Sequence, residues 1–144
     1  MEKKALFICV HNSARSQMAA AFTDVYGKGR ITADSAGLEP GVLNPYVVEV
    51  MKEKGIDISR NQPKSVMDVY NTGRSFDFVI TVCDPEAGQK CPVFPGEMKR
   101  LHWTFADPSA LTGDRALILS ETRRIRDDIE EKVKQWIKEM EWTR

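Results

Sequence analysis

The sequence lacks an excess of either charge. Its 144 residues include 21 Lys and Arg and 21 Asp and Glu, so the formal net charge is zero. We therefore expect no nucleic-acid or membrane-surface partner bound through bulk charge, and any anion must be recognised locally. The chain also lacks an apolar run long enough to cross a membrane, and its first residues lack the long apolar region of a signal peptide. We expect a cytoplasmic protein.

Cysteine and histidine are both scarce, with three Cys and two His. In a reducing compartment so few cysteines are more often buried, catalytic or metal-binding than paired in structural disulfides. A standard zinc site is disfavoured, because residues 84–90 separate Cys83 from Cys91 and few histidines are available. The chain contains no internal repeat, low-complexity tract or linker. We expect one domain over residues 1–144 and a monomer.

Short apolar segments alternate with segments of helical spacing. Strands are predicted over residues 5–8, 30–37, 76–82 and 99–105, and helices over 15–27, 45–55, 65–73 and the last segment. On that last helix one stripe is apolar, and the charges of residues 123–132 are expected on its solvated faces. The alternation predicts an α/β fold, a four-stranded parallel sheet with helices on both faces. Such sheets bind ligands at the carboxyl ends of their strands, which Cys9, Cys83 and Asp107 all follow.

The first predicted strand runs into the segment "CVHNSARS", which opens the first predicted helix. Loop N–H groups and a helix N-terminus favour an anion there, and Arg15 can make a two-pronged contact with a tetrahedral oxyanion. The same surroundings favour the thiolate form of Cys9, which would lie beneath that anion as a nucleophile. Asn12 is expected in a left-handed backbone conformation, and Ser16 as a partner of the loop or the thiolate. The alternative is an inert buried cysteine with a solvated arginine.

A carboxylic acid follows the fourth predicted strand at Asp107-Pro108. Near the pocket, Asp107 could protonate an oxygen that leaves the bound oxyanion, and Pro108 would stiffen the turn that presents it. The alternative is an ordinary Asp-Pro turn.

The three cysteines suit the reduction of arsenate, a tetrahedral ion for which phosphate and sulfate are mimics. Reduction to arsenite takes two electrons, which two thiols supply when they form a disulfide. Cys9 would attack arsenic with loss of water, a second thiol would attack the sulfur of Cys9 and release arsenite, and a third would move the disulfide away by exchange. Three cysteines are the minimum for that relay, and Cys9, Cys83 and Cys91 provide them.

The segment "CVHNSARS" resembles the Cys-x5-Arg-Ser/Thr phosphate loop of the low-molecular-weight protein tyrosine phosphatase superfamily. The resemblance implies that superfamily's fold, with Cys9 as nucleophile, Arg15 as oxyanion clamp and Asp107 as general acid. Asn12 would support the loop and Ser16 would contact the thiolate. The implied oxyanion-binding loop consists of Val10, His11, Asn12, Ser13, Ala14, Arg15 and Ser16.

Nearly the whole chain resembles one branch of this superfamily, the thioredoxin-coupled arsenate reductases. Further shared motifs are "SAG" from Ser35, "NP" from Asn44, "DIS" from Asp57, "CP" from Cys91 and the segment around Asp107-Pro108. The resemblance implies that Cys83 attacks the Cys9 adduct and that Cys91 completes a Cys83–Cys91 disulfide, which thioredoxin reduces. A glutathione-type thiol is the alternative reductant. The chain has one residue more between its last two cysteines than the six that are usual.

The resemblance implies no tightly bound cofactor. Some members bind potassium near the loop, and Asn12, Ser35 and Asp68 match their ligands, whereas an acidic ligand on the first helix is replaced by Ala20. Two other functions stay open. One is a phosphatase for phosphotyrosine or small phosphoesters, although Ser109-Ala110-Leu111 lacks the aromatic residues that tyrosine-specific relatives carry there. The other is a non-enzymatic oxyanion or redox sensor.

Overall fold

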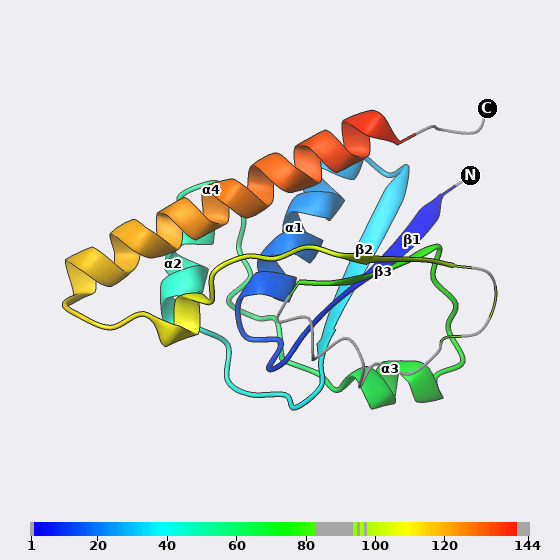
Figure 1. The fold of residues 1–144 in the computed structure, drawn as a ribbon, viewed down its shortest axis with the longest axis horizontal. Helices are drawn as coiled ribbons and strands as arrows, with labels where there is room; N and C mark the ends of the chain where they lie inside the picture. The colour runs from blue at the N-terminus through cyan, green and yellow to red at the C-terminus, as the bar shows by residue number, and fades with distance from the viewer. Residues whose placement is uncertain (1, 83–93, 95, 97, 141–144) are drawn as a thin grey trace.

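A four-stranded parallel sheet forms the centre of the molecule (Figure 1). The computed structural model describes residues 2–82, 94, 96 and 98–140. The strands are β1 (Lys3–Cys9), β2 (Ile31–Gly37), β3 (Phe78–Thr81) and β4 (Lys99–His102). They lie in the order β2-β1-β3-β4, and every neighbouring pair is parallel. The predicted sheet is confirmed.

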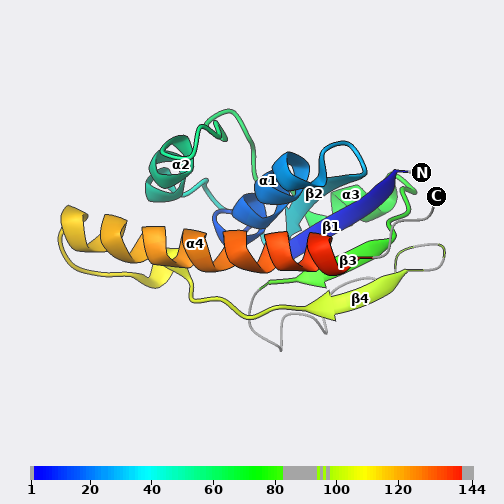
Figure 2. The ribbon, with the colours of Figure 1, turned by 90° about the horizontal axis from the view of Figure 1, so that it is seen from above.

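Helices cover both faces of this sheet, as predicted (Figure 2). They are α1 (Arg15–Gly27), α2 (Pro45–Lys52), α3 (Val66–Asn71) and α4 (Arg115–Glu139), with a short 3-10 turn, η2, at Pro108–Ala110. Side chains that alternate along β1 point to opposite faces of the sheet. Phe7 packs in a cluster with α1 and α4, whereas Leu6 packs in a cluster with α3. Among the described residues, no helix is both long and apolar enough to cross a membrane.

The helices begin where the sequence provides a cap. Asn44 caps α2, with Pro45 at the first position as predicted, and Ser65 and Asp114 cap α3 and α4. The ends are less regular. The second helix stops at Lys52, short of the predicted Gly55, because Gly55 donates its N–H to the Lys52 carbonyl in a closing turn.

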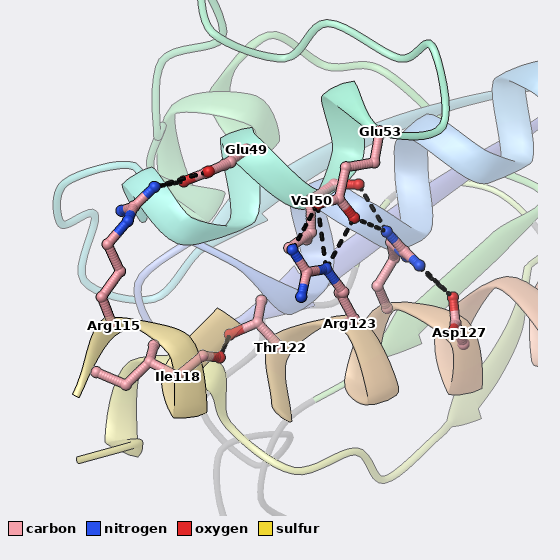
Figure 3. A network of polar contacts seen from close by, with 9 residues as sticks. Glu49, Val50, Glu53, Arg115, Ile118, Thr122, Arg123 and Asp127 are labelled. Carbon is pink, nitrogen blue, oxygen red and sulfur yellow. Dashed lines mark hydrogen bonds and ion pairs between the residues drawn. The ribbon is translucent and has the colours of Figure 1, made fainter. Parts of the chain in front are cut away.

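An ionic network fastens α2 to α4 (Figure 3). Arg123 makes a bidentate contact with Glu53, and this guanidinium holds the pKa of Glu53 below its usual value. Arg126 corrects the prediction that the charges of α4 are all solvated: it is only 7% exposed. Its Nη1 donates to the Val50 carbonyl at 2.9 Å and to Glu53 at 2.8 Å. Because the last carbonyls of a helix need donors, Arg126 fixes the C-terminal turn of α2 on α4.

Candidate active site

The loop between β1 and α1 turns its carbonyl groups outward. The carbonyls of Cys9, Val10, His11 and Ser13 accept hydrogen bonds from the N–H groups of Leu38, Glu39, Gly41 and Asn44, at 2.7–3.1 Å. The Asn12 carbonyl accepts from the Gln17 side chain at 3.1 Å. A loop whose carbonyls all bond outward leaves its N–H groups for the concave side, which is the geometry of an anion-binding nest. The segment after β2 therefore holds the phosphate loop open for an anion.

Gly37 packs directly against the backbone of this loop. A Cβ at this position would lie 2.8 Å from the Asn12 nitrogen and 2.8 Å from the His11 carbonyl carbon. Both atoms are backbone, so no rotamer change can relieve the contact.

Gly37→Ala should therefore push the phosphate loop out of shape. We expect kcat/KM for a small oxyanion substrate to fall about 100-fold, as for loss of an oxyanion donor. The matched control is Gly55→Ala, whose Cβ would meet no atom within 4 Å although φ is +74°. The control should lose about 1 kcal/mol in a thermal or urea unfolding experiment and keep its activity. Equal activity in the two variants would contradict this account of Gly37.

Two donors converge on the Cys9 sulfur, which is buried. The Asn12 N–H lies 3.2 Å from it and the Ser16 hydroxyl 2.8 Å. Asn12 has the predicted left-handed conformation, with φ of 54°, which turns its N–H toward the sulfur. The backbone N–H of Lys64 can only donate, and this fixes the direction of the hydrogen bonds between Asn12, Ser16 and the Cys9 sulfur. The Lys64 N–H donates to Asn12 Oδ1 at 3.1 Å, so the Asn12 amide nitrogen faces Ser16 and donates to its Oγ at 2.8 Å.

The Ser16 hydroxyl proton is then available to the Cys9 sulfur. Two hydrogen bonds, one from a backbone N–H and one from a hydroxyl, thus hold the Cys9 sulfur in place. This is the contact that the sequence predicted for Ser16.

Arg15 lies at the first position of α1 and is 7% exposed. The N-cap residue, Ala14, makes no side-chain hydrogen bond to the helix, and the first turn of α1 has no acidic residue. No carboxylate of this first turn therefore competes with an anion for the first N–H groups and the dipole of the helix. The Arg15 guanidinium contacts the loop that follows β4 (the opposite loop), where Nη1 donates to the Phe105 carbonyl at 3.2 Å.

Asp107 lies on that opposite loop, as predicted for an acid at the pocket. Its Oδ2 is 3.7 Å from Arg15 Nη2, and its side chain is 40% exposed. Oδ1 accepts the N–H of Ser109 at 2.9 Å, which makes Asp107 the cap of η2, with Pro108 next to it. The structure thus brings Cys9, Arg15 and Asp107 to the same edge of the sheet.

The other predicted residues are placed as follows. His11 is exposed on the rim, and its Nδ1 donates to the Glu39 carbonyl at 2.8 Å. Ala14 is buried, and Val10 and Ser13 are half-buried in the loop. Cys83 and Cys91, the predicted relay residues, lie outside the described residues.

The predicted potassium ligands are a poor fit for a cation. The Asn12 Oδ1 already accepts from the Lys64 N–H and the Gln17 side chain. Ser35 lines a cavity of about 410 Å³, but so does Lys64, whose ammonium group pairs there with Asp34. Asp68 is exposed on α3. The potassium site stays a prediction from the resemblance.

Sequence reasoning missed Gln17. This residue is 3% exposed, donates to both oxygens of Asn12, and accepts from Asn61 at 3.0 Å. Its position one residue after Ser16 in the loop motif was the available signal. Its partner, 44 residues away, has no signature in the sequence.

A second hollow of about 260 Å³ is lined in part by Pro108 and Ser109, which follow Asp107 in the chain. Its lining is mostly apolar and comes from residues 42–46, from the turn after Asp107 (the acid turn) and from α4. It includes Leu43, Tyr46, Pro108, Leu111 and Ile118. Tyr46 supplies an aromatic ring that the residues after Asp107 lack. The hollow therefore presents a mostly apolar surface next to the turn that follows Asp107.

Comparison with known proteins agrees with this geometry. The family model of the low molecular weight phosphotyrosine protein phosphatases matches residues 4–143. The arsenate reductase of Bacillus subtilis strain 168 is 40% identical over 139 residues, which cover 94% of this chain and 96% of that protein. An arsenate reductase solved in a phosphate-binding state has a TM-score of 0.74 and 28% identity, covering 96% of this chain and 99% of that one.

A further solved structure is the thioredoxin-dependent arsenate reductase of Corynebacterium glutamicum. Its TM-score is 0.63 at 29% identity, over 94% of this chain and 63% of that one. The family match spans nearly the whole chain, including the phosphate loop and the acid turn. The chain belongs to the low molecular weight phosphotyrosine protein phosphatase family.

Proposed function

We propose that this protein is an arsenate reductase that uses three cysteines and is regenerated by thioredoxin. The observation that carries the proposal is the buried Cys9 sulfur with its two donors, next to the uncapped start of α1 and Arg15. This arrangement accepts a tetrahedral oxyanion, for which phosphate or sulfate would compete. The 40% identity to an arsenate reductase supports arsenate as the substrate.

In the first step the Cys9 thiolate attacks arsenic. An S–As bond forms and an As–O bond breaks, while arsenic stays pentavalent. Arg15 and the loop N–H groups stabilise the charge on the oxygens that remain. Asp107 gives its proton to the departing oxygen, which leaves as water.

In the second step Cys83 attacks the sulfur of Cys9. A Cys9–Cys83 disulfide forms, and the electron pair of the S–As bond goes to arsenic, which leaves as arsenite. Cys91 then attacks Cys83, which frees the Cys9 thiolate and leaves a Cys83–Cys91 disulfide. Thioredoxin reduces that disulfide and restores both thiols. The thioredoxin-dependent relative supports this choice of reductant.

The same proposal implies a location and an assembly. The relay needs a compartment in which thioredoxin keeps thiols reduced, so we place the protein in the cytoplasm. All three thiols and the acid come from one chain, so the proposed functional unit is a monomer.

Aryl-phosphate hydrolysis is the second candidate function. It needs only Cys9, Arg15 and Asp107, and the mostly apolar hollow next to the turn that follows Asp107 would accept an aryl group. In this reaction water, not a thiol, would resolve the adduct on Cys9.

The two functions are separated by measuring both reactions on the same protein. Arsenite formation is followed with thioredoxin, thioredoxin reductase and NADPH, and hydrolysis with 4-nitrophenyl phosphate. We expect kcat/KM for arsenate of at least about 10⁴ M⁻¹s⁻¹, the lower range for enzymes on their own substrates, and a much lower value for the ester. Cys9→Ser is the control and should abolish both reactions. Fast hydrolysis without arsenite formation would make the protein a phosphatase.

A further inference from the structure

We infer that Asn44 is a positioning residue that holds the Asp107 turn over the phosphate loop. Asn44 is 8% exposed and joins three segments that are far apart in the sequence. Its backbone N–H donates to the Ser13 carbonyl of the phosphate loop at 2.9 Å. Its side chain caps α2 and also reaches Ser109 on the acid turn.

The orientation of the Asn44 amide is fixed by its partners. Oδ1 accepts from the N–H groups of Tyr46 at 2.9 Å and Val47 at 3.3 Å. Both partners are donors, so this atom is the oxygen, and the amide nitrogen faces the other way. Nδ2 therefore donates to the Ser109 hydroxyl at 3.1 Å. A single buried side chain thus satisfies the start of α2 and anchors the acid turn.

The anchor determines which oxygen of Asp107 faces the pocket. The Ser109 N–H holds Oδ1 at 2.9 Å, which leaves Oδ2 directed toward Arg15, 3.7 Å away. Asp107 is otherwise held on a three-residue 3-10 turn at the surface. The far end of α2 is fastened by Arg126 on the Val50 carbonyl, so Asn44 extends from a helix that is itself fixed.

This role deepens the proposed function, because it rests on Asp107 being the acid for the departing oxygen. A displaced acid slows only the steps that need its proton. The decrease in reaction rate relative to the parent should therefore grow as the leaving group becomes more basic. General damage to the fold would instead slow the reaction of every substrate by the same factor.

Two substitutions, called the link variants, remove the Asn44–Ser109 hydrogen bond and keep the cap of α2. Ser109→Ala deletes the acceptor hydroxyl but retains the N–H that binds Asp107. Asn44→Ser retains a capping oxygen but is too short to reach Ser109. The matched control is Ser65→Ala, which removes the cap of α3 on the other face of the sheet.

The test measures hydrolysis of phenyl phosphate, a poor leaving group, and of 2,4-dinitrophenyl phosphate, a good one. Both link variants should lower kcat/KM for phenyl phosphate about tenfold, a fraction of what a general acid contributes, and change kcat/KM for the dinitrophenyl ester about twofold at most. The constant kcat/KM is compared because it covers only the steps up to departure of the leaving group, whereas kcat also includes the step in which water resolves the adduct. Ser65→Ala should leave both rates unchanged.

A double variant separates positioning from other effects. In an Asp107→Asn background, Ser109→Ala should cause no further loss, because the acid that it positions is already absent. Equal losses on both esters, or a full further loss in the Asp107→Asn background, would overturn the inference. The ester assays need neither Cys83 nor thioredoxin, so a protein that fails to reduce arsenate but shows this leaving-group pattern would contradict the proposed function alone.

Discussion

Arg15→Lys should lower kcat/KM for arsenate by about 100-fold to 1,000-fold, the range for loss of an oxyanion-stabilising donor. Lysine keeps the positive charge but lacks the planar fork that contacts two oxygens of a tetrahedral ion. It also lacks the geometry that lets Arg15 hold the Phe105 carbonyl while lying 3.7 Å from Asp107. The measurement is steady-state arsenite formation, with phosphate inhibition as a separate readout of oxyanion binding.

The matched control is Arg123→Lys on the surface of α4. Arg123 makes a bidentate contact with the carboxylate of Glu53, and its side chain is 42% exposed. Its replacement should leave arsenate turnover within about twofold of the parent, because exposed ion pairs contribute little. If Arg15→Lys behaves like this control, Arg15 does not clamp the oxyanion.

Cys83→Ser and Cys91→Ser should each abolish thioredoxin-coupled arsenate turnover, a loss of at least about 1,000-fold because each removes a nucleophile that acts in series. Hydrolysis of 4-nitrophenyl phosphate should stay within about twofold of the parent, because water resolves that adduct. The same two variants also report the order of the relay. Without thioredoxin, Cys91→Ser should still release one arsenite per chain and stop at a Cys9–Cys83 disulfide, whereas Cys83→Ser should release none.

Each outcome of that pair has a distinct meaning. Arsenite release by Cys83→Ser but not by Cys91→Ser would reverse the order of the two thiols. Turnover at the parent rate in both variants would show that neither takes part. The ester assay serves as the internal control for folding.

The sequence predicted the elements whose signals are local. Asn44 and Pro45 marked the start of α2, and the apolar run before Cys9 marked β1. The start of β1 was harder to predict. The strand begins at Lys3, which is not apolar, and it is the pairing of Lys3 with Ile31 of β2 that makes this residue part of the strand. The fourth strand was predicted to end at residue 105, whereas β4 ends at His102. After Trp103, whose N–H still donates to the Thr81 carbonyl of β3, the chain turns away from the sheet and the Phe105 carbonyl accepts from Arg15.

The site was predicted as far as its motifs are contiguous. "CVHNSARS" indicated Cys9, Asn12, Arg15 and Ser16. The structure places Asn12 and Ser16 on the buried Cys9 sulfur, and Arg15 is buried at the start of α1. The supports of the site were not predicted, because they are long-range polar contacts. Nothing in the spacing of Asn44 and Ser109, 65 residues apart, indicates their hydrogen bond. The burial of Arg126 was equally hidden within a charged stretch.

The proposed chemistry is tested most directly by the products of one turnover without any external reductant. Reduced protein is mixed with excess arsenate, arsenite is quantified, free thiols are counted, and the disulfide is located by peptide mass spectrometry. The relay predicts one arsenite and two lost thiols per chain, with Cys83 joined to Cys91 and Cys9 free. Unchanged thiols with no arsenite, in a protein that still hydrolyses aryl phosphates through Cys9, would contradict it.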